Sequence, residues 1–86
     1  MLENQLEKHL TAECKRLGLI AIKLWPFGAV GIPDRLILAP GGHVCFLELK
    51  TENGKLSKRQ VYWQTRLKDL GFKATVTYGK TSTSNA

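Results

Sequence analysis

Three residues in the middle of the chain, Asp34, Glu48 and Lys50, have the types and spacing that acid–base or metal chemistry requires. Glu48 and Lys50 are two positions apart in an apolar stretch, so in a strand both side chains project from one face. Such charges are energetically expensive at the end of an apolar strand unless they reach solvent or serve a function. Asp34 follows Pro33, which fixes φ and restricts its neighbour Ile32 to extended geometry.

The turn between Asp34 and Glu48 decides whether the two carboxylates converge. A three-residue loop at 40–42 would place Asp34 directly opposite Glu48, with Cβ atoms about 5 Å apart. A two-residue Gly-Gly loop would place Arg35 there instead. A bulge at the strand end is a further way to turn Asp34 toward Glu48. The sequence leaves these alternatives open.

Converging carboxylates repel each other, and a shared proton or a cation must relieve that repulsion. Hard oxygen ligands of this kind suit Mg²⁺ or Mn²⁺. Such a metal lowers the pKa of a bound water and bridges to a phosphate oxygen, so the pattern favours phosphodiester hydrolysis. Lys50 would then position or help deprotonate the attacking water and stabilise charge growing on the phosphate.

The first half of the chain predicts one helix and three strands. Leucines and a cysteine recur at helical spacing and Gly18 follows, which predicts a helix over residues 2–17. Three stretches rich in Ile, Leu and Val predict strands over 19–25, 35–39 and 44–50. We expect the last two of these to form an antiparallel hairpin.

The second half predicts a helix and a strand. Ser57 and Gln60 have the form of a capping box at the start of a helix that Gly71 ends. The expected apolar face of this helix consists of Val61, Trp63, Leu67 and Leu70. A short β-branched strand follows over 74–78. The order αβββαβ predicts an α/β (α+β) fold, a sheet with a helix on one or both faces, as a single domain over 1–79 with a flexible polar tail over 80–86.

Length and charge limit the classes of partner. The chain has 86 residues and a formal net charge of +6, and residues 50–86 carry this whole excess. A basic half suits a polyanion such as nucleic acid, although a solvated surface has the same composition. A domain of this size buries only about 60 to 65% of its unfolded surface, so we expect a marginal core and a homodimer. The sequence has neither a membrane-length apolar run nor a signal-peptide pattern, so we expect an intracellular protein with no membrane partner.

Cysteines and histidines are not predicted to carry the chemistry. Cys14 and Cys45 lack a CxxC spacing and nearby histidine partners, which favours buried thiols over a disulfide or a zinc site. His9 and His43 are far apart in the sequence and have no ligand partner at a fixed spacing, so we expect surface histidines.

Several short motifs together resemble a known family. Gly31-Ile32-Pro33-Asp34, then Glu48-Leu49-Lys50, then Gly54-Lys55-Leu56-Ser57 with Gln60 and Trp63, resembles the VRR-Nuc family of PD-(D/E)XK nucleases, in the short stand-alone form of phages and prophages. The PD…ExK pattern alone is loose, but the Gly-x-Leu-Ser-x-x-Gln stretch and the αβββαβ order make the match more specific. The resemblance spans about residues 3 to 79 and implies a restriction-endonuclease-like core, a mixed sheet flanked by helices.

The resemblance also implies metal-dependent DNA cleavage with Mg²⁺ or Mn²⁺ and assigns residues to it. The implied catalytic residues are Asp34, Glu48, Lys50 and Gln60. The implied metal ligands are Asp34, Glu48, the backbone carbonyl of Leu49, and Glu7. Glu3, one helical turn before Glu7, is the alternative glutamate on the first helix.

Family members of this type look like homodimers with Holliday-junction-resolvase-like or other structure-directed activity. The resemblance therefore implies branched or duplex DNA as the partner, a role in phage or bacterial replication, recombination or repair, and location in the cytoplasm of a bacterial or phage-infected cell. A replication or recombination protein is a further expected partner.

Basic and aromatic residues near the expected site are the candidate DNA contacts. The candidates are Lys23, Trp25, Arg35, Lys55, Lys58, Arg59 and Arg66. Lys23 and Arg35 have an alternative role in balancing carboxylates. Phe27 shares a glycine-rich loop with Trp25 and is also expected to touch DNA, whereas Trp63 is expected in core or dimer packing.

Two other functions compete with a structure-directed nuclease. The first is a small basic nucleic-acid-binding module without catalysis, which would keep or gain affinity on losing Asp34 or Glu48. The second is a sequence-specific, restriction-like nuclease, which we disfavour because the short chain leaves little protein for reading base edges.

Overall fold

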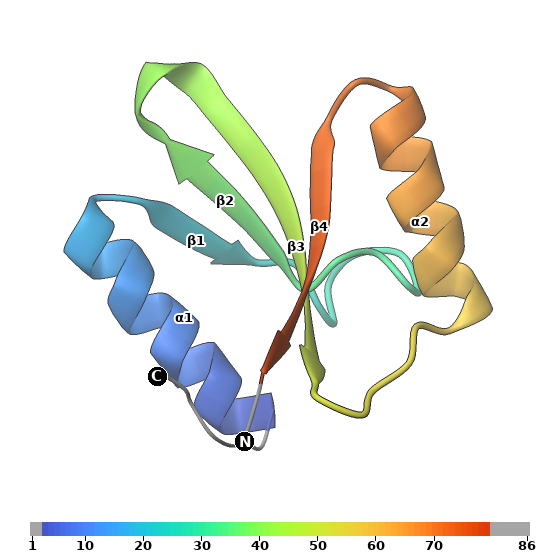
Figure 1. Ribbon diagram of the computed structural model, residues 1–86. Coiled ribbons are helices and arrows are strands. Elements are labelled where there is room, and N and C mark those ends of the chain that lie inside the picture. The colour runs from blue at the N-terminus through green and yellow to red at the C-terminus, as the bar shows by residue number, and fades with distance from the viewer. Residues whose placement is uncertain (1–2, 80–86) are drawn as a thin grey trace.

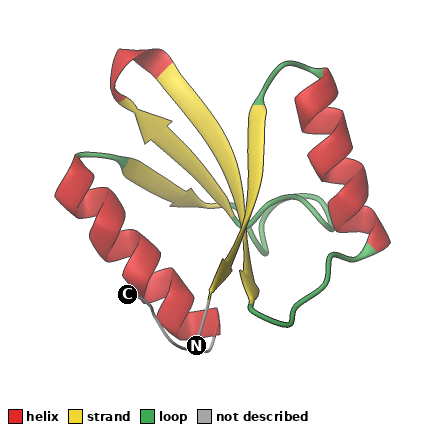
Figure 2. Ribbon diagram, in the orientation of Figure 1, coloured by secondary structure: helices red, strands yellow, loops and turns green. Residues whose placement is uncertain are grey.

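The structure is a computed structural model that describes residues 3–79, which form one four-stranded sheet and two helices. Figure 1 shows the arrangement and Figure 2 the element types. The elements are α1 (Glu3–Leu17), β1 (Ile20–Lys23), β2 (Arg35–Ala39), the 3₁₀ turn η1 (Pro40–Gly42), β3 (His43–Thr51), α2 (Lys58–Asp69) and β4 (Lys73–Gly79). The predicted order αβββαβ and the α+β class are confirmed. The expected tail over 80–86 lies outside the described residues, so the division into a domain and a tail stays a prediction.

The sheet is mixed, with the strand order β1-β2-β3-β4. β1 pairs antiparallel with β2, and β2 pairs antiparallel with β3, as expected for the hairpin. β4 pairs parallel with β3. A parallel pair needs a crossover connection, and α2 supplies it.

The register of the β2–β3 hairpin is that of the three-residue loop. Ala39 pairs with His43 and Arg35 pairs with Leu47, so the same register continued by one position brings Asp34 opposite Glu48. The turn contains two glycines at φ +81° and +77°, the left-handed region that glycine adopts without steric cost. A two-residue Gly-Gly turn would also use glycines at positive φ, so the observed pairing of Ala39 with His43, and not the presence of the glycines, settles the register that the sequence left open.

The two helices cover opposite faces of the sheet. Arg35 and Leu47 share the face to which α1 contributes Glu7, since Arg35 hydrogen-bonds to Glu7. Glu48 projects from the other face, where it accepts a hydrogen bond from Gln60 of α2. α1 lies along β1 and β3, and α2 lies along β4 (Figure 1). The buried apolar residues are Leu6, Cys14, Pro33, Ile37, Leu49, Leu67 and Ala74.

Three of the predicted strands differ in their bounds, and one of them, β3, runs over 43–51 instead of the predicted 44–50. β1 ends at Lys23 rather than at Trp25, because the N–H groups of Phe27 and Gly28 both turn back to the carbonyl of Leu24. β4 is longer than predicted, over 73–79. Within the described residues, neither helix has the length and hydropathy of a membrane-spanning segment.

The predicted apolar face of α2 is only partly correct. Leu67 is buried as expected, but Val61 and Leu70 are exposed and the polar Gln64 is buried. Gln60, Gln64 and Leu67 follow the helical spacing of one face, and Val61 lies about 100° away from Gln60 around the helix. Contact with the sheet, rather than side-chain polarity alone, selects the buried face.

Candidate active site

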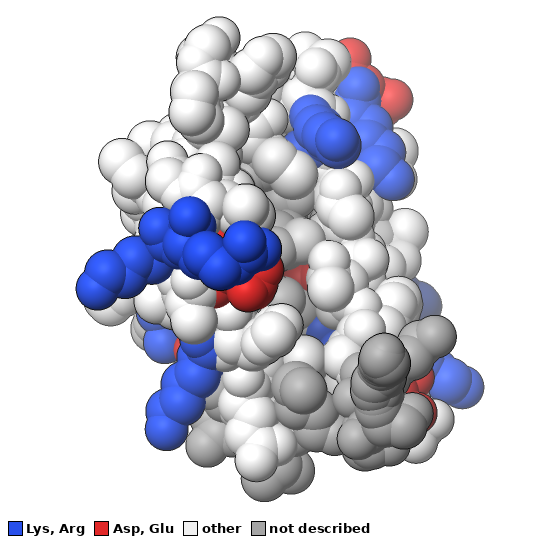
Figure 3. Space-filling model, turned by 60° about the vertical axis from the view of Figure 1, so that its left-hand side comes forward, with Lys and Arg blue, Asp and Glu red and all other residues white. Residues whose placement is uncertain are grey.

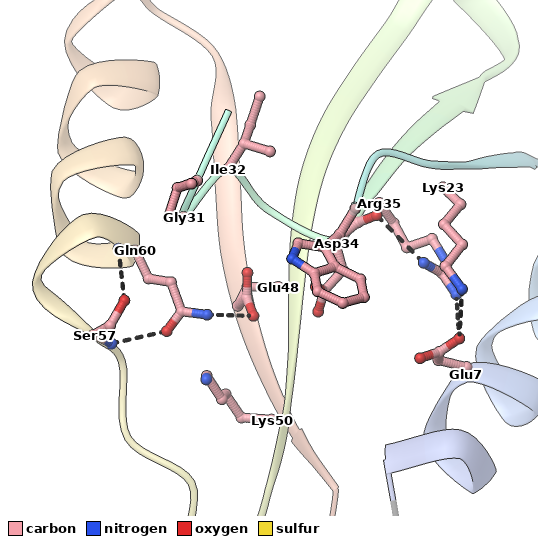
Figure 4. Close-up of a pocket in the computed structure, with 12 residues that line it drawn as sticks. Glu7, Lys23, Gly31, Ile32, Asp34, Arg35, Glu48, Lys50, Ser57 and Gln60 are labelled. Atoms are coloured by element: carbon pink, nitrogen blue, oxygen red, sulfur yellow. Dashed lines mark hydrogen bonds and ion pairs between the residues drawn. The ribbon is translucent and has the colours of Figure 1, made fainter. Parts of the chain in front are cut away.

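A cavity of about 320 Å³ lies where β2 begins, and both helical layers contribute to its lining (Figure 4). It gathers most of the residues predicted from the sequence. These are Glu7, Lys23, Trp25, Asp34, Arg35, Glu48, Lys50 and Gln60. The remaining lining residues, which were not predicted as site residues, are Val30, Gly31, Ile32 and Ser57.

Asp34 and Glu48 both face this cavity. The Asp34 carboxylate accepts a hydrogen bond from the backbone N–H of Leu49 at 3.0 Å, which ties the start of β2 to β3. Glu48 is only 2% exposed. Because a buried carboxylate is costly without compensating partners, its place beside Asp34 needs a structural or chemical reason.

Gln60 links Glu48 to the start of α2. Its side-chain N–H group donates to Glu48 at 3.1 Å, and its amide oxygen accepts from the backbone N–H of Ser57 at 2.8 Å. The Ser57 hydroxyl in turn accepts from the backbone N–H of Gln60, completing the predicted capping box. The amide of Gln60 is thereby held with its N–H group toward Glu48 (Figure 4).

Lys50 lies two residues after Glu48 in β3 and lines the same cavity. A Cβ atom at Gly54 would lie 3.2 Å from Cδ of Lys50 and 3.4 Å from its Cβ. Gly54 belongs to the loop after β3, which turns back through its N–H bond to the carbonyl of Thr51. The glycine of this loop therefore gives the Lys50 side chain the space it occupies.

The third predicted carboxylate, Glu7, is engaged with two cations. Its carboxylate oxygen lies 2.8 Å from Arg35 and 3.6 Å from Lys23. The Arg35 side chain is almost fully buried, so it balances Glu7 instead of reaching outward, whereas the Lys23 side chain is half exposed. Among residues 5–79, whose side chains the structure describes, no three His, Cys, Asp or Glu side chains gather as a metal-ligating group, so Glu7 does not join Asp34 and Glu48 in one cluster.

The loop between β1 and β2 forms one wall of the cavity and rests on α2. The indole N–H of Trp63 donates to the carbonyl of Val30 at 3.1 Å, so this half-buried tryptophan anchors a loop. A Cβ atom at Gly31, which has φ +87°, would lie 2.5 Å from Cβ of Arg59. The signal for this contact was the glycine of the Gly31-Ile32-Pro33-Asp34 motif, since close backbone approach often needs glycine.

The remaining candidate DNA contacts do not line the cavity. Lys55, Lys58, Arg59 and Arg66 are all exposed. Lys58 and Arg59 lie in the first turn of α2 beside the cavity, but Arg66 is in its last turn. On the face drawn in Figure 3, basic side chains occur in separate groups next to carboxylates rather than as one continuous basic surface.

The cysteines and histidines stay outside the site. Both cysteines are free thiols, Cys14 buried as predicted and Cys45 half-buried. Burial, and then the charge of Glu13, raise the pKa of the Cys14 thiol. His9 and His43 are exposed, as expected.

Known proteins resemble this chain in sequence and in fold. No family model matches it. The chain is 38% identical over 74 residues to p44 of Acyrthosiphon pisum secondary endosymbiont phage 1, a protein named as a candidate nuclease, and the match covers 86% of this chain and 80% of p44. A solved structure described as a VRR_NUC domain superposes with a TM-score of 0.80 at 30% identity, covering 91% of this chain and 84% of that one.

A second solved structure has the same fold at lower identity. It is Hjc from Archaeoglobus fulgidus, a Holliday junction resolvase from a hyperthermophile, with a TM-score of 0.67 and 21% identity. The match covers 93% of this chain and 69% of that one.

Proposed function

The chain belongs to the VRR-Nuc family, and from this membership we propose that it is a divalent-metal-dependent DNA endonuclease that hydrolyses phosphodiester bonds. The observation that carries the proposal is the meeting of Asp34, Glu48, Lys50 and Gln60 in one cavity. These residues come from a loop, one strand and a helix, and they are the residues of the family motif.

The carboxylates fit a Mg²⁺ or Mn²⁺ ion. Mg²⁺ is usually bound through one or two carboxylates with waters and substrate phosphates, so Asp34 and Glu48 suffice as side-chain ligands. We propose the backbone carbonyl of Leu49 as a further ligand, and Glu7 as a ligand remains a prediction. When bound, the ion would supply a Lewis acid and a water of lowered pKa.

The other residues of the cavity act on the carboxylates, the water and the phosphate. Gln60 orients the Glu48 carboxylate by donating to it. The Lys50 ammonium positions the attacking water and stabilises negative charge that develops on the phosphate oxygens. Glu7 holds Lys23 and Arg35 at the rim of the cavity, and Lys23 is the one of the two that is exposed enough to meet a phosphate.

We propose that the DNA backbone lies over the cavity and the first turn of α2. The residues that would contact phosphates near the cavity are Lys23, Lys55, Lys58 and Arg59. Trp25 would contact a nucleotide, and Arg66, in the last turn of α2, would contact a phosphate farther along the DNA. Arg35 would contribute by balancing the charge of Glu7. The fold shared with a Holliday junction resolvase supports branched DNA as the substrate. The phage relative supports a role in phage or bacterial DNA replication, recombination or repair, and a partner protein in that process stays a prediction.

The test is cleavage of supercoiled plasmid and of synthetic four-way junctions with Mg²⁺, Mn²⁺ or EDTA. Wild type should nick or cut DNA with either metal and not with EDTA. Asp34→Ala and Lys50→Ala should each lower cleavage at least about 100-fold, because they remove a metal ligand and charge stabilisation worth several kcal/mol. DNA binding, measured in EDTA, should persist in both variants.

Matched controls come from the far end of α2. Asp69→Ala and Lys68→Ala remove the same types of charge outside the cavity and should leave cleavage unchanged. The non-catalytic binding module would be supported instead if wild type binds both DNAs but cuts neither. In that case the Asp34→Ala variant should bind DNA with equal or higher affinity than wild type.

A further inference from the structure

The loop over residues 24–32, between β1 and β2, is held in place at several points. Within it, the N–H groups of Phe27 and Gly28 each donate to the Leu24 carbonyl at 2.8 Å, and that of Ile32 donates to Ala29 at 3.1 Å. At its base, the Leu24 N–H donates to the Asp34 carbonyl at 2.8 Å. Contacts of the loop with Trp63 and Arg59 add a tether to α2. The loop therefore has a defined shape.

Despite these tethers, the loop presents apolar side chains to solvent. Trp25 is 56% exposed, Val30 69% and Phe27 83%. Trp25 and Val30 also line the cavity that holds Asp34 and Glu48, and Phe27 lies between them in the sequence. An ordered loop that exposes large apolar side chains beside a polar cavity is typical of a contact surface.

Charge identifies what this surface contacts. Lys23 immediately precedes the loop and lines the cavity, and the backbone and Cβ of Arg59 approach Gly31 within it. Lys23, which is half exposed and paired with Glu7, and the exposed Arg59 thus lie at the base of the loop, and an apolar tip above two basic residues fits a group that is flat and apolar but carries a phosphate. A nucleotide has this chemistry, and aromatic side chains bind nucleobases of any sequence by stacking.

We propose that the tip of the 24–32 loop stacks on an unpaired nucleobase next to the scissile phosphate. The placement of that phosphate rests on the proposed function, because Asp34 and Lys50 define where it lies. In a continuous duplex, neighbouring base pairs cover both faces of a base, so no face is open to Phe27 or Trp25. The loop therefore selects DNA that has an unpaired base beside the cut, such as a flap or an overhang, over continuous duplex.

The test measures binding separately from cleavage. A 5′ flap and a continuous duplex, with 2-aminopurine at the first unpaired position of the flap or at the matching duplex position, are titrated in EDTA, where no cleavage is expected. Phe27→Ala should weaken flap binding about 5- to 100-fold, the range for loss of one stacked base, and change duplex binding less than about 2-fold. Wild type should quench 2-aminopurine fluorescence on the flap, and Phe27→Ala should lose that quenching.

Two further substitutions distinguish stacking from apolar contact in general. Phe27→Trp keeps an aromatic face and should retain flap binding, whereas Phe27→Leu keeps apolar character without that face and should resemble Phe27→Ala. Leu70→Ala, which removes an exposed apolar side chain at the other end of α2, should change nothing.

Other outcomes would overturn the inference. The tip does not bind an unpaired base if Phe27→Ala loses equal affinity for flap and duplex, or if Phe27→Leu and Phe27→Ala both bind the flap as wild type does. A change in the oligomeric state of Phe27→Ala, measured by sedimentation, would also contradict the inference. Cleavage assays on the same DNAs keep the two proposals apart. Flap-selective binding without any cleavage would refute the nuclease activity and support the role of the loop. Cleavage without selective binding of the flap would support the nuclease activity and refute the role of the loop.

Discussion

Gln60 shows how one side chain serves both the fold and the site. Its amide oxygen caps the first turn of α2 through the backbone of Ser57, and its N–H group donates to the buried Glu48. Because the amide has one acceptor end and one donor end, the capping bond fixes which end Glu48 receives. Residues that orient a metal-binding carboxylate commonly change activity 10- to 100-fold when they are replaced.

Comparing Gln60→Ala with Ser57→Ala separates these two contributions. Each substitution breaks the capping box and should lower the free energy of unfolding by about 1 kcal/mol, about 4–8 °C in Tm for a small domain. Only Gln60→Ala also removes the donor to Glu48, so it should lower cleavage at least about 10-fold, while Ser57→Ala should stay close to wild type below its Tm. Urea unfolding and plasmid nicking measure the two effects. Equal activities in the two variants would mean that Gln60 serves the helix alone.

At the scale of elements, the site depends on the fit between the 24–32 loop and α2. Asp34 follows this loop in the chain. Its carboxylate accepts a hydrogen bond from the Leu49 N–H of β3, and the loop before it packs through Gly31 against Arg59 of α2. The two contacts reach different layers of the fold. A change in the loop should therefore affect both stability and the position of Asp34.

Gly31→Ala should be far more damaging than Gly42→Ala. Both glycines have positive φ, +87° and +77°, so either substitution carries a backbone penalty of about 1–2 kcal/mol. A Cβ at Gly42 meets nothing within 4 Å, whereas at Gly31 it would lie 2.5 Å from Cβ of Arg59 and 2.6 Å from its carbonyl carbon. We expect an additional loss of about 1–3 kcal/mol for Gly31→Ala, measured by urea unfolding, together with reduced cleavage. Equal losses at the two positions would show that α2 moves away without cost.

In the molecule as a whole, part of one sheet face exposes apolar side chains of β1. α2 packs on one face of the sheet along β4. On the same face, α2 does not extend over β1 and β2, where the cross-strand pairs Ile20–Leu38 and Ile22–Leu36 lie. Ile20 is 60% exposed and Ile22 41% exposed. A second copy of the chain would bury this apolar surface, which agrees with the homodimer expected from the small core.

The predicted dimer should therefore be sensitive to charge on this face. We expect wild type to sediment as a dimer, and Ile20→Lys or Ile22→Lys to raise the dimer dissociation constant at least about 10-fold by placing an unpaired charge in the interface. Leu17→Lys, at the exposed end of α1, is the matched control and should sediment as wild type does. A wild type that is monomeric at all concentrations, or equal weakening by all three substitutions, would contradict this interface.

The elements, their order and the candidate site residues were all predictable from the amino-acid sequence. Helical spacing, the capping box of Ser57 and Gln60, and the alternation that places Glu48 and Lys50 on one face are local properties, so a single chain segment contains the information for each of them. The family motif, which spans these segments, is likewise a property of the sequence.

How distant segments of the chain meet was not predictable from the sequence and is seen in the folded structure. The three-residue turn over Pro40–Gly42 sets the register that brings Asp34 opposite Glu48, whereas the same glycines would also allow a two-residue turn with another register. The pairing of Glu7 with Arg35 and Lys23, the burial of Gln64 in place of Val61, and the hydrogen bond from Trp63 to Val30 each join residues from different elements. Such contacts depend on the relative placement of helices and sheet, which is set by packing of the whole core and is not encoded in the periodicity of any one segment.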